Sequence, residues 1–321
     1  MPSYNASQFI KDAIDSILVQ TYRDFELVLI NDGSNDNTEK IIQSFSDDRI
    51  KYIHVQKNHG VASSLNLGLS ISIGEYIARM DADDIALPER MQTQITFLDN
   101  NPQVLVCGTA VLPYVEGKVR KPFPIKTNPL NCLLDAYFSH PSVMMRRELF
   151  DNETLRYQSR SEDLYIWNKI FSHYNYDSTI FYNLPTPLLL YRIHNQQITH
   201  QQSNEFIQAK QQTRRYFLDR FFNIVGIEFR FADINQLETK SFQIFAKALN
   251  TFNHFKDYSI DEINEFKTSL LYHFALAINP TSFKDKLTLA IGYLKYSPHR
   301  TFQTLKLIPK LFLNSSEVPK F

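Results

Sequence analysis

Three carboxylates gather in the segment Met80-Asp81-Ala82-Asp83-Asp84, directly after a mainly apolar run at residues 75–80. That run is typical of a short buried strand, whose end lies at the rim of a sheet, where α/β folds bind ligands. Hard divalent cations prefer carboxylate oxygens and fill their other positions with water and substrate phosphates. The segment therefore predicts a metal site that holds a diphosphate. The alternative is a turn whose aspartates only cap the next helix.

A second acidic group, Ser161-Glu162-Asp163, opens a predicted helix at residues 161–171. Serine is a preferred N-cap and the helix dipole favours acids in the first turn, so capping alone explains this pattern.

The composition excludes several classes of protein. The 321 residues contain 34 Lys and Arg against 34 Asp and Glu, so charge gives no argument for nucleic-acid binding. Two cysteines, Cys107 and Cys132, form neither a disulfide framework nor a metal-spaced set, which indicates a reducing compartment. The sequence contains no apolar run of about 18 residues and no signal peptide pattern. These features predict a cytoplasmic protein.

The first hundred residues alternate between strand and helix patterns. Strands are predicted at 25–30, 50–55 and 75–80, and helices at 7–20, 38–45, 61–73 and from Pro88. This alternation predicts an α/β fold with a doubly wound, mixed but mainly parallel, Rossmann-like sheet. The later pattern is mixed, with strands predicted at 104–112 and 142–145 and helices at 130–138 and 161–171.

A boundary is predicted at residues 200–202, which separates a main domain at 1–202 from a helical region at 203–321. The tail at 284–321 has seven basic residues against two acidic ones, interleaved with apolar side chains. Such a segment suits contact with an anionic membrane surface at the inner face of the plasma membrane. The alternative is an ordinary helix pair with a solvated basic face.

Several motifs together resemble glycosyltransferase family 2, which has the GT-A fold. The resemblance covers about residues 1–195 and rests on Pro2-Ser3-Tyr4-Asn5, Asn31-Asp32-Gly33-Ser34, Asn58-His59-Gly60, Asn66-Leu67-Gly68, Asp81-Ala82-Asp83-Asp84, Ser161-Glu162-Asp163 and Tyr191-Arg192-Ile193-His194. It is strongest to the bacterial branch that builds capsule, O-antigen or other surface polysaccharide. It implies an inverting transferase that moves a hexosyl or N-acetylhexosaminyl group from a nucleotide sugar, a UDP-sugar, to a saccharide or lipid-linked saccharide.

The resemblance also implies roles at the centre of the site. Mn²⁺ or Mg²⁺ would be held by Asp83, with Asp81 near the ribose and the metal's water shell. His194 would be a further metal ligand, although a surface histidine is the alternative. Asp163 would be the base that deprotonates the acceptor hydroxyl, and Glu162 would orient the acceptor or the base. Asp84 would support the loop.

Other positions are expected around the donor. The turn Pro2, Tyr4, Asn5 and the acid Asp32 would form the nucleobase pocket, with a carboxylate that accepts the uracil imide N–H. Asn58 and Asn66 would bond the base or ribose, or only cap their turns. Arg79 would reach a phosphate or pair with Asp81. Arg192 would bind the diphosphate bidentately. His140 is a candidate acceptor contact.

Two departures and two competing functions accompany the resemblance. Residue 31 is Asn where the family often has Asp, and only Met1 stands where the family's first strand would end, so we expect a truncated first strand. A nucleotidyltransferase of sugar phosphates also uses aspartate-held metal, but no glycine-rich loop precedes Gly33. A catalytically silent binding subunit is the third hypothesis, against which the acids at 83 and 163 argue.

Overall fold

The computed structural model describes residues 1–158, 161–195, 197, 204–229, 239–256 and 258–278. Contacts divide the chain into two compact units. Unit 1 takes residues 1–129, 136–174 and 179–210, and unit 2 takes 130–135, 175–178 and 211–321. The predicted boundary at 200–202 and the basic tail at 284–321 lie outside the described residues.

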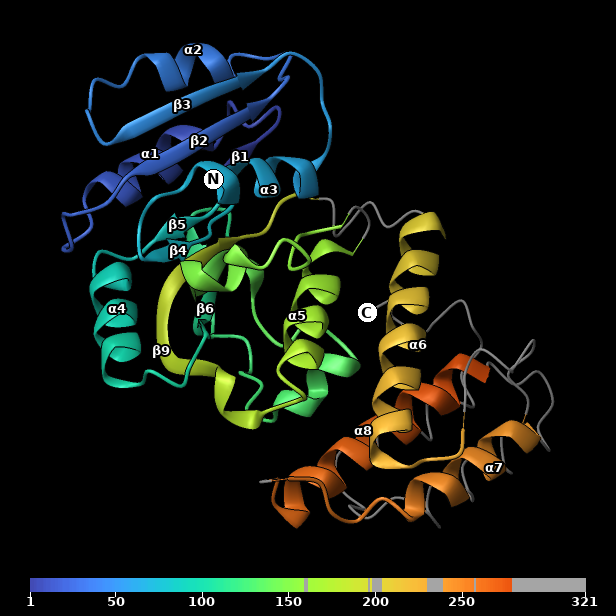
Figure 1. Ribbon diagram of the computed structural model, residues 1–321. Coiled ribbons are helices and arrows are strands. Elements are labelled where there is room, and N and C mark those ends of the chain that lie inside the picture. Colours follow the sequence, from blue (N-terminus) through green and yellow to red (C-terminus); the bar gives the residue numbers. More distant parts are fainter. Residues whose placement is uncertain (159–160, 196, 198–203, 230–238, 257, 279–321) are drawn as a thin grey trace. The chain divides into compact units, whose positions relative to one another are not determined.

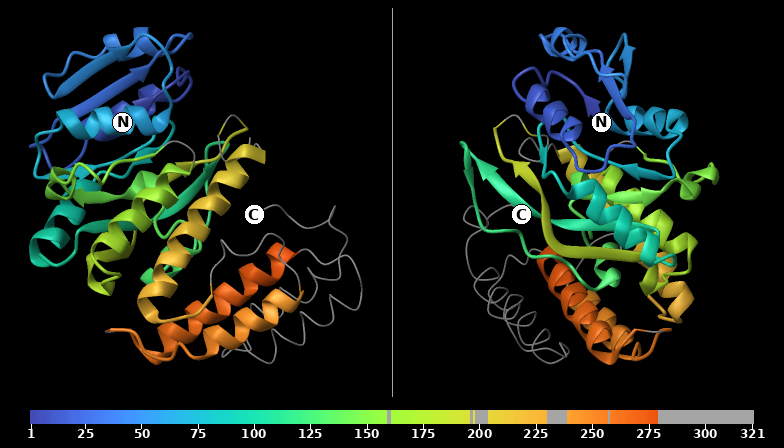
Figure 2. Two further views of the ribbon diagram at one scale, coloured as in Figure 1. Left: turned by 45° about the vertical axis from the view of Figure 1, so that its right-hand side comes forward. Right: turned by 90° about the vertical axis from the view of Figure 1, so that its left-hand side faces the viewer.

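Unit 1 begins with a three-stranded parallel sheet in the order β1-β2-β3. Its strands are β1 (Pro2–Ser3), β2 (Leu27–Asp32) and β3 (Ile50–Val55). Helices α1 (Ile10–Leu18) and α2 (Thr38–Gln43) lie on one face, and α3 (Val61–Ile71) lies on the other (Figures 1 and 2). Because helices cover both faces, every residue of β2 is buried, which explains why its first four residues are all apolar.

A second, mixed sheet follows in the order β4-β8-β6-β9-β5, with β7 paired to β6. Figure 1 labels β4, β5, β6 and β9 of this sheet. Of its pairs only β6 with β9 is parallel. Its strands are β4 (Tyr76–Ala78), β5 (Ile85–Ala86), β6 (Val106–Val115), β7 (Lys118–Val119), β8 (Met144–Arg146) and β9 (Phe181–Arg192). Short 3₁₀ helices are η1 (Pro129–Leu133), η2 (His140–Ser142), η3 (Arg147–Asp151) and η4 (Ser178–Ile180).

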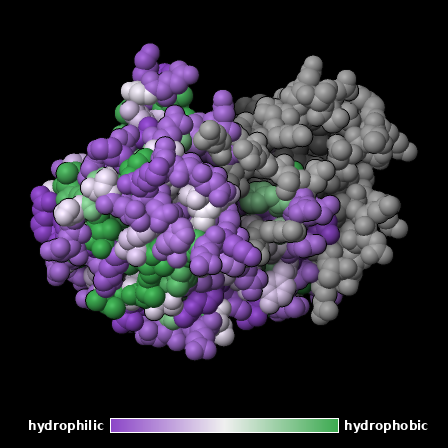
Figure 3. Space-filling view, turned by 90° about the horizontal axis from the view of Figure 1, so that it is seen from above, coloured by the Kyte–Doolittle hydropathy of each residue, from purple (hydrophilic) through white to green (hydrophobic). Residues whose placement is uncertain are grey.

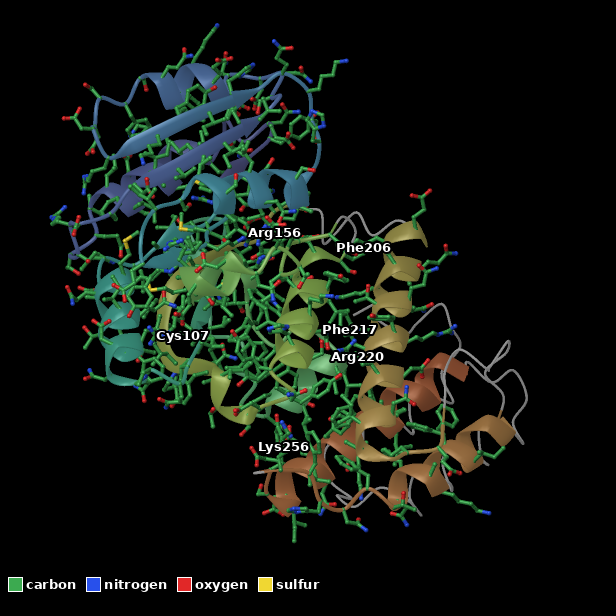
Figure 4. All side chains as sticks on the ribbon, viewed as in Figure 1. Cys107, Arg156, Phe206, Phe217, Arg220 and Lys256 are labelled. Carbon is green, nitrogen blue, oxygen red and sulfur yellow. The ribbon has the colours of Figure 1, made fainter. Side chains whose placement is uncertain are left out.

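Two longer helices pack on this mixed sheet. From α4 (Arg90–Asn100), the Gln94 side chain donates to the carbonyl of Cys107, which is fully buried on β6 (Figure 4). From α5 (Glu162–His173), the ring of Phe171 stacks on Phe181 of β9 at 5.3 Å between centroids. The sheet and these helices carry the strand ends on which the candidate site is built.

The predicted mixed α/β class is confirmed, but the strands form two sheets instead of one, because β4 pairs with β8 and not with the three-stranded sheet. The helix predicted at 130–138 is wrong in extent, since only the 3₁₀ helix η1 forms there. Leu130, Cys132, Leu133 and Leu134 are all buried, so this segment buries neighbouring positions instead of a single helical stripe.

Unit 2 is helical and has an aromatic core. Helices α6 (Asn204–Val225), α7 (Thr239–Asn250) and α8 (Ile260–Ile278) supply most of it, and Figure 4 marks Phe217 on α6. The ring of Phe221 packs edge-on against four others, those of Tyr176, Phe252, Phe255 and Phe266. Among the described residues no helix is long and apolar enough to cross a membrane. On the face of the molecule seen from above, the residues drawn in colour are mostly hydrophilic, with groups of hydrophobic residues between them (Figure 3).

Gly33 is a position at which both the backbone conformation and the space around it disfavour a side chain. Its φ is +72°, and a Cβ there would lie 2.9 Å from the backbone nitrogen of Asn58. We expect Gly33→Ala to lower the free energy of unfolding by about 3 kcal/mol, from the left-handed backbone and the clash together.

The matched control is Gly117→Ala. Gly117 has a φ of +77°, but the nearest atom to a Cβ added there, the Tyr114 hydroxyl, is 4.0 Å away. Only the backbone cost of about 1 kcal/mol applies at this position. Urea unfolding of both variants measures the difference, and equal losses would show that the close approach at Gly33 is unimportant.

Candidate active site

The acidic segment lies directly after β4, where the chain leaves the mixed sheet. Possible ligand oxygens of Asp81, Asp83 and Asp84 all lie within 4.8 Å of one another. Asp84 is fully buried; its Oδ1 accepts the backbone N–H of Arg192 at 2.9 Å, whereas its Oδ2 has no hydrogen-bond partner. A buried carboxylate oxygen without a donor is costly, and a cation nearby would compensate it.

His194 joins this cluster from a position 111 residues after Asp83 in the sequence. Its Nε2 lies 3.0 Å from Oδ2 of Asp83, and its ring packs against Phe9 at 4.4 Å between centroids. Burial, and next the charge of Asp81, raise the pKa of Asp83. Burial and both neighbouring carboxylates also raise the pKa of Asp84. Three crowded carboxylates beside an imidazole fit a hard divalent cation, which relieves their mutual repulsion.

Arg79 holds Asp81 in place. Its guanidinium contacts both carboxylate oxygens, at 2.7 Å and 2.6 Å, and its side chain is only 5% exposed. Of the two predicted roles for Arg79, the structure shows the pairing with Asp81. This bidentate pair with a buried guanidinium fixes the orientation of the Asp81 carboxylate beside Asp83.

Arg192 is occupied by contacts within the protein. Its Nε donates to the carbonyl of Asp83 at 2.7 Å, and its Nη2 donates to Asp12 at 3.0 Å. The guanidinium also lies over the rings of Phe9 and Tyr114, at 5.0 and 5.2 Å from their centroids. These contacts make Arg192 a clamp that ties β9 to the acidic loop, and its contact with a diphosphate stays a prediction.

Asp32 is the last residue of β2 and organises the loop that lies against the end of this strand. Its two oxygens accept the backbone N–H groups of His59 and Gly60, at 3.0 and 2.8 Å. Asn58 caps the same turn, because its side-chain oxygen accepts the N–H of Gly60 at 2.9 Å. Asp32 therefore shapes the loop at 57–60 against Gly33. Each of its oxygens keeps a second lone pair for a further donor.

The turn that follows β1, at Tyr4 and Asn5, lies next to Asp32. Tyr4 is 46% exposed, so its ring is accessible to a ligand. Asn5 has a φ of +49°, a conformation that asparagine tolerates, and its side-chain oxygen accepts the N–H of Asn35 at 2.8 Å. Pro2 pairs with Ile30 across β1 and β2. The roles of these residues toward a nucleobase stay predictions.

Asn66 has a role that its sequence motif does not predict. Its side-chain amide donates to the carbonyl of Tyr157 at 2.8 Å and accepts the N–H of the same residue at 2.9 Å. Tyr157 in turn places its hydroxyl 3.2 Å from Nε2 of His140, whose ring stands edge-on to Trp167. Burial lowers the pKa of His140 well below its usual range, so the imidazole is neutral.

The paired bonds of Asn66 give a testable consequence. We expect Asn66→Ala to cost about 2 kcal/mol of unfolding free energy, because two backbone groups of Tyr157 lose their partner. Asn100→Ala is the control, since Asn100 is exposed and bonds only within its own helix. Thermal unfolding measures both, and a loss at Asn66 no larger than at Asn100 would contradict this role.

Glu162 and Asp163 stand in the first turn of α5. Ser161 precedes them with a φ of +64°, and its side chain makes no hydrogen bond that caps the helix. Oδ1 of Asp163 accepts the N–H of Leu164 at 2.7 Å. Burial, and then the charge of Asp163, raise the pKa of Glu162, and Asp81 contributes in the same direction. The two acidic groups of the sequence are thus close enough to interact.

Two residues of the site had no sequence signal. Asp12 lies on the exposed side of α1, where an acid is ordinary, yet it holds Arg192. Tyr157 lies in an irregular segment without periodicity. The folded chain alone brings them to the site, from positions that no motif marks.

This fold and site define an α/β protein with a cluster of carboxylates at its strand ends. The family model Glycosyl transferase family 2 matches residues 1–160. An uncharacterized glycosyltransferase of Haemophilus influenzae is 29% identical over 330 residues, covering 96% of this chain and 94% of that protein. The uncharacterized glycosyltransferase MJ1057 of Methanocaldococcus jannaschii is 31% identical over 209 residues, covering 61% and 70%. The chain belongs to glycosyltransferase family 2 and is a glycosyltransferase.

Two further comparisons agree. The putative glycosyltransferase EpsE of Bacillus subtilis is 36% identical over 180 residues, covering 53% of this chain and 65% of EpsE. The crystal structure of S. aureus TarS 1-349 in complex with UDP-GlcNAc matches with a TM-score of 0.57 at 16% identity, over 97% of this chain and 88% of the other. The likeness to TarS shows the fold, which is the GT-A fold that the sequence motifs predicted.

Proposed function

We propose that this glycosyltransferase moves a sugar from a UDP-sugar to an acceptor hydroxyl with inversion, and that a divalent cation, Mn²⁺ or Mg²⁺, binds at Asp81, Asp83 and His194. The observation that carries the proposal is the cluster of carboxylates within 4.8 Å, one of whose buried oxygens has no partner. A bound cation supplies Lewis acidity, which stabilises a departing diphosphate. The residues present fit that group in type and in charge.

The protein orients this cluster before any ligand arrives. Arg79 fixes Asp81 from one side, and the clamp of Arg192 on the Asp83 carbonyl fixes the loop from the other. Phe9 packs on His194 and restrains its ring beside Asp83. Such preorganisation lowers the cost of aligning charges in the transition state.

Asp163 is the proposed base. Inversion needs a carboxylate that takes the proton of the acceptor hydroxyl as it attacks from the face opposite the leaving group. Asp163 is half-buried, and its neighbour Glu162 interacts with both Asp163 and Asp81. Glu162 is the group proposed to orient the acceptor.

Uracil is the proposed base of the donor nucleotide. Asp32 keeps lone pairs free for a uracil imide N–H, whereas cytosine has no hydrogen at the equivalent nitrogen. Tyr4 offers an accessible ring for stacking. TarS, whose fold is similar, binds UDP-GlcNAc, which makes a UDP-hexosamine a reasonable first donor. The proposed acceptor is a saccharide, free or lipid-linked, in surface-polysaccharide synthesis.

The test is a donor screen with a product assay. The full chain is incubated with UDP-sugars, with GDP-mannose for comparison, and with or without Mn²⁺. Release of UDP that depends on Mn²⁺ supports the proposal. Release of pyrophosphate from a nucleoside triphosphate and a sugar phosphate would support a nucleotidyltransferase instead. No turnover with any donor would favour the silent binding subunit.

A further inference from the structure

The segment at residues 116–124, called here the basic hairpin, follows the end of β6 and is exposed along its whole length. It carries three basic side chains and two large apolar ones, whereas its only acid is Glu116. The basic residues are Lys118, Arg120 and Lys121, and the apolar ones are Val119 and Phe123. The chain as a whole is balanced, with 34 basic and 34 acidic residues, so this hairpin is a local concentration of positive charge.

The basic side chains of the hairpin point to an external anion. In the described part of the chain, no ion pair or side-chain hydrogen bond involves Lys118, Arg120 or Lys121. The apolar side chains beside them are also accessible, since Val119 is 52% exposed and Phe123 is 44% exposed. Exposed cations next to exposed apolar surface are typical of segments that lie at the interface of an anionic bilayer.

The backbone holds the basic hairpin in a defined shape. Both turn residues, 116–117, have a positive φ, +49° and +77°, as the tight turn of a β-hairpin requires. Beyond β7, two N–H groups donate to carbonyls of β6, from Arg120 to Pro113 at 2.8 Å and from Phe123 to Val111 at 3.3 Å. A proline on each side of Phe123 further restricts the backbone. A segment ordered in this way loses little conformational entropy when it binds a surface.

The basic hairpin is attached to the strand end that carries the candidate site. Tyr114, near the end of β6, lies under the guanidinium of Arg192 at 5.2 Å from its ring centroid. The ring of Phe123 stands edge-on to that of Tyr191, at 6.2 Å between centroids. Arg192 in turn holds the acidic loop through the carbonyl of Asp83. A surface that contacts the hairpin is therefore close to the candidate site.

We infer that the basic hairpin docks on the surface of an anionic phospholipid bilayer. Its three basic side chains meet lipid phosphates, and Val119 and Phe123 enter the boundary between headgroups and acyl chains. A soluble polyanion fits less well, because it offers no apolar layer to these two side chains. If the acceptor is lipid-linked, docking brings the bilayer that holds it to the site. That consequence rests on the proposed function, whereas the docking itself does not.

The test is cosedimentation of the full chain with vesicles in about 0.1 M salt, without donor or metal. The vesicles contain phosphatidylcholine alone, or phosphatidylcholine and phosphatidylglycerol in equal parts. We expect binding only to the anionic vesicles. Replacing the three basic side chains together, as Lys118→Ser, Arg120→Ser and Lys121→Ser, weakens this binding by about 100-fold, at about fivefold for each charge.

The matched control removes the same charge elsewhere. Lys11→Ser, Lys40→Ser and Lys247→Ser together change three exposed positions, on α1, α2 and α7. Because charges more than a Debye length from the lipid surface are screened, we expect this triple variant to bind within about threefold of the unmodified chain. Thermal unfolding of both triple variants confirms that they fold.

Two further measurements leave the charges in place. Phe123→Ser weakens binding by about fivefold or more, because an apolar side chain no longer enters the interface. Phe123→Trp retains binding, since tryptophan suits the headgroup level of a bilayer. On the unmodified chain, we expect anionic vesicles to slow hydrogen exchange at residues 116–124 by at least about fivefold.

Four results would overturn the inference. The unmodified chain could fail to bind anionic vesicles, or could bind phosphatidylcholine alone equally well. Equal binding by the two triple variants would mean that another part of the chain docks. Binding to heparin, a soluble polyanion, that matches vesicle binding and is unchanged in Phe123→Ser would mean that the hairpin holds an anionic carbohydrate. Each of these results leaves the tests with UDP-sugars and Mn²⁺ unaffected, so a failure of docking is distinct from a failure of the proposed function.

Discussion

We expect replacement of Asp83 by Asn to reduce kcat/KM for sugar transfer by about 10³-fold or more, because the divalent cation proposed to stabilise the leaving diphosphate would lose its central ligand. Asn keeps the size of the side chain but not its charge, so the contact with His194 and the loop can persist. The measurement is steady-state UDP release at saturating Mn²⁺, with thermal unfolding to confirm that the variant folds.

The control for this prediction is Asp151→Asn. Asp151 is exposed, and its pair with Arg147 is long at 3.4 Å, so a surface charge is changed without touching the site. We expect its activity to stay within about twofold of the unmodified chain, since such surface changes have small effects. Asp83→Asn with activity equal to this control would exclude a catalytic metal at the cluster.

Replacing Asp163 by Asn has the second large effect and a different signature. We expect kcat to fall by about 10²- to 10⁴-fold, the usual contribution of a general base, whereas UDP affinity stays unchanged. The Oδ1 of Asn can still accept the N–H of Leu164, so the start of α5 is preserved. Pre-steady-state transfer and donor binding, measured on the same preparation, separate the two quantities.

Glu162→Gln serves as the companion variant. Because Glu162 is proposed to orient the acceptor, we expect its replacement to raise KM for the acceptor more than it lowers kcat. If Glu162→Gln abolishes kcat and Asp163→Asn does not, the roles of the two acids are exchanged. A loss of UDP affinity in Asp163→Asn would instead place this residue in the donor site.

The sequence was sufficient to predict the helices and strands that have a strong hydrophobic periodicity or are fully buried. The strand predicted at 50–55 matches β3, and the apolar run of β2 is buried on both faces. It was insufficient for β5 and β7, which have two residues each and no measurable period. It also did not reveal that β4 belongs to a different sheet from β2, because strand pairing is decided by contacts distant in sequence.

The contacts of the candidate site also divide into those that the sequence predicted and those that it did not. The pairing of Arg79 with Asp81 follows from two-residue spacing and was among the predicted alternatives. The approach of His194 to Asp83, 111 residues apart, was expected only from the family resemblance. The bonds of Asn66 to Tyr157 and of Arg192 to Asp12 depend on tertiary packing. No local pattern specifies which of several polar partners such side chains choose.

The most direct test of the metal-dependent donor site is calorimetric titration of UDP into the full chain, with and without Mn²⁺, beside Asp83→Asn. We predict that UDP binds with Mn²⁺, that removal of the metal weakens binding by at least about tenfold, and that Asp83→Asn shows the weak binding under both conditions. Tight UDP binding that is indifferent to Mn²⁺ and to Asp83 would contradict a metal-dependent donor site at this cluster.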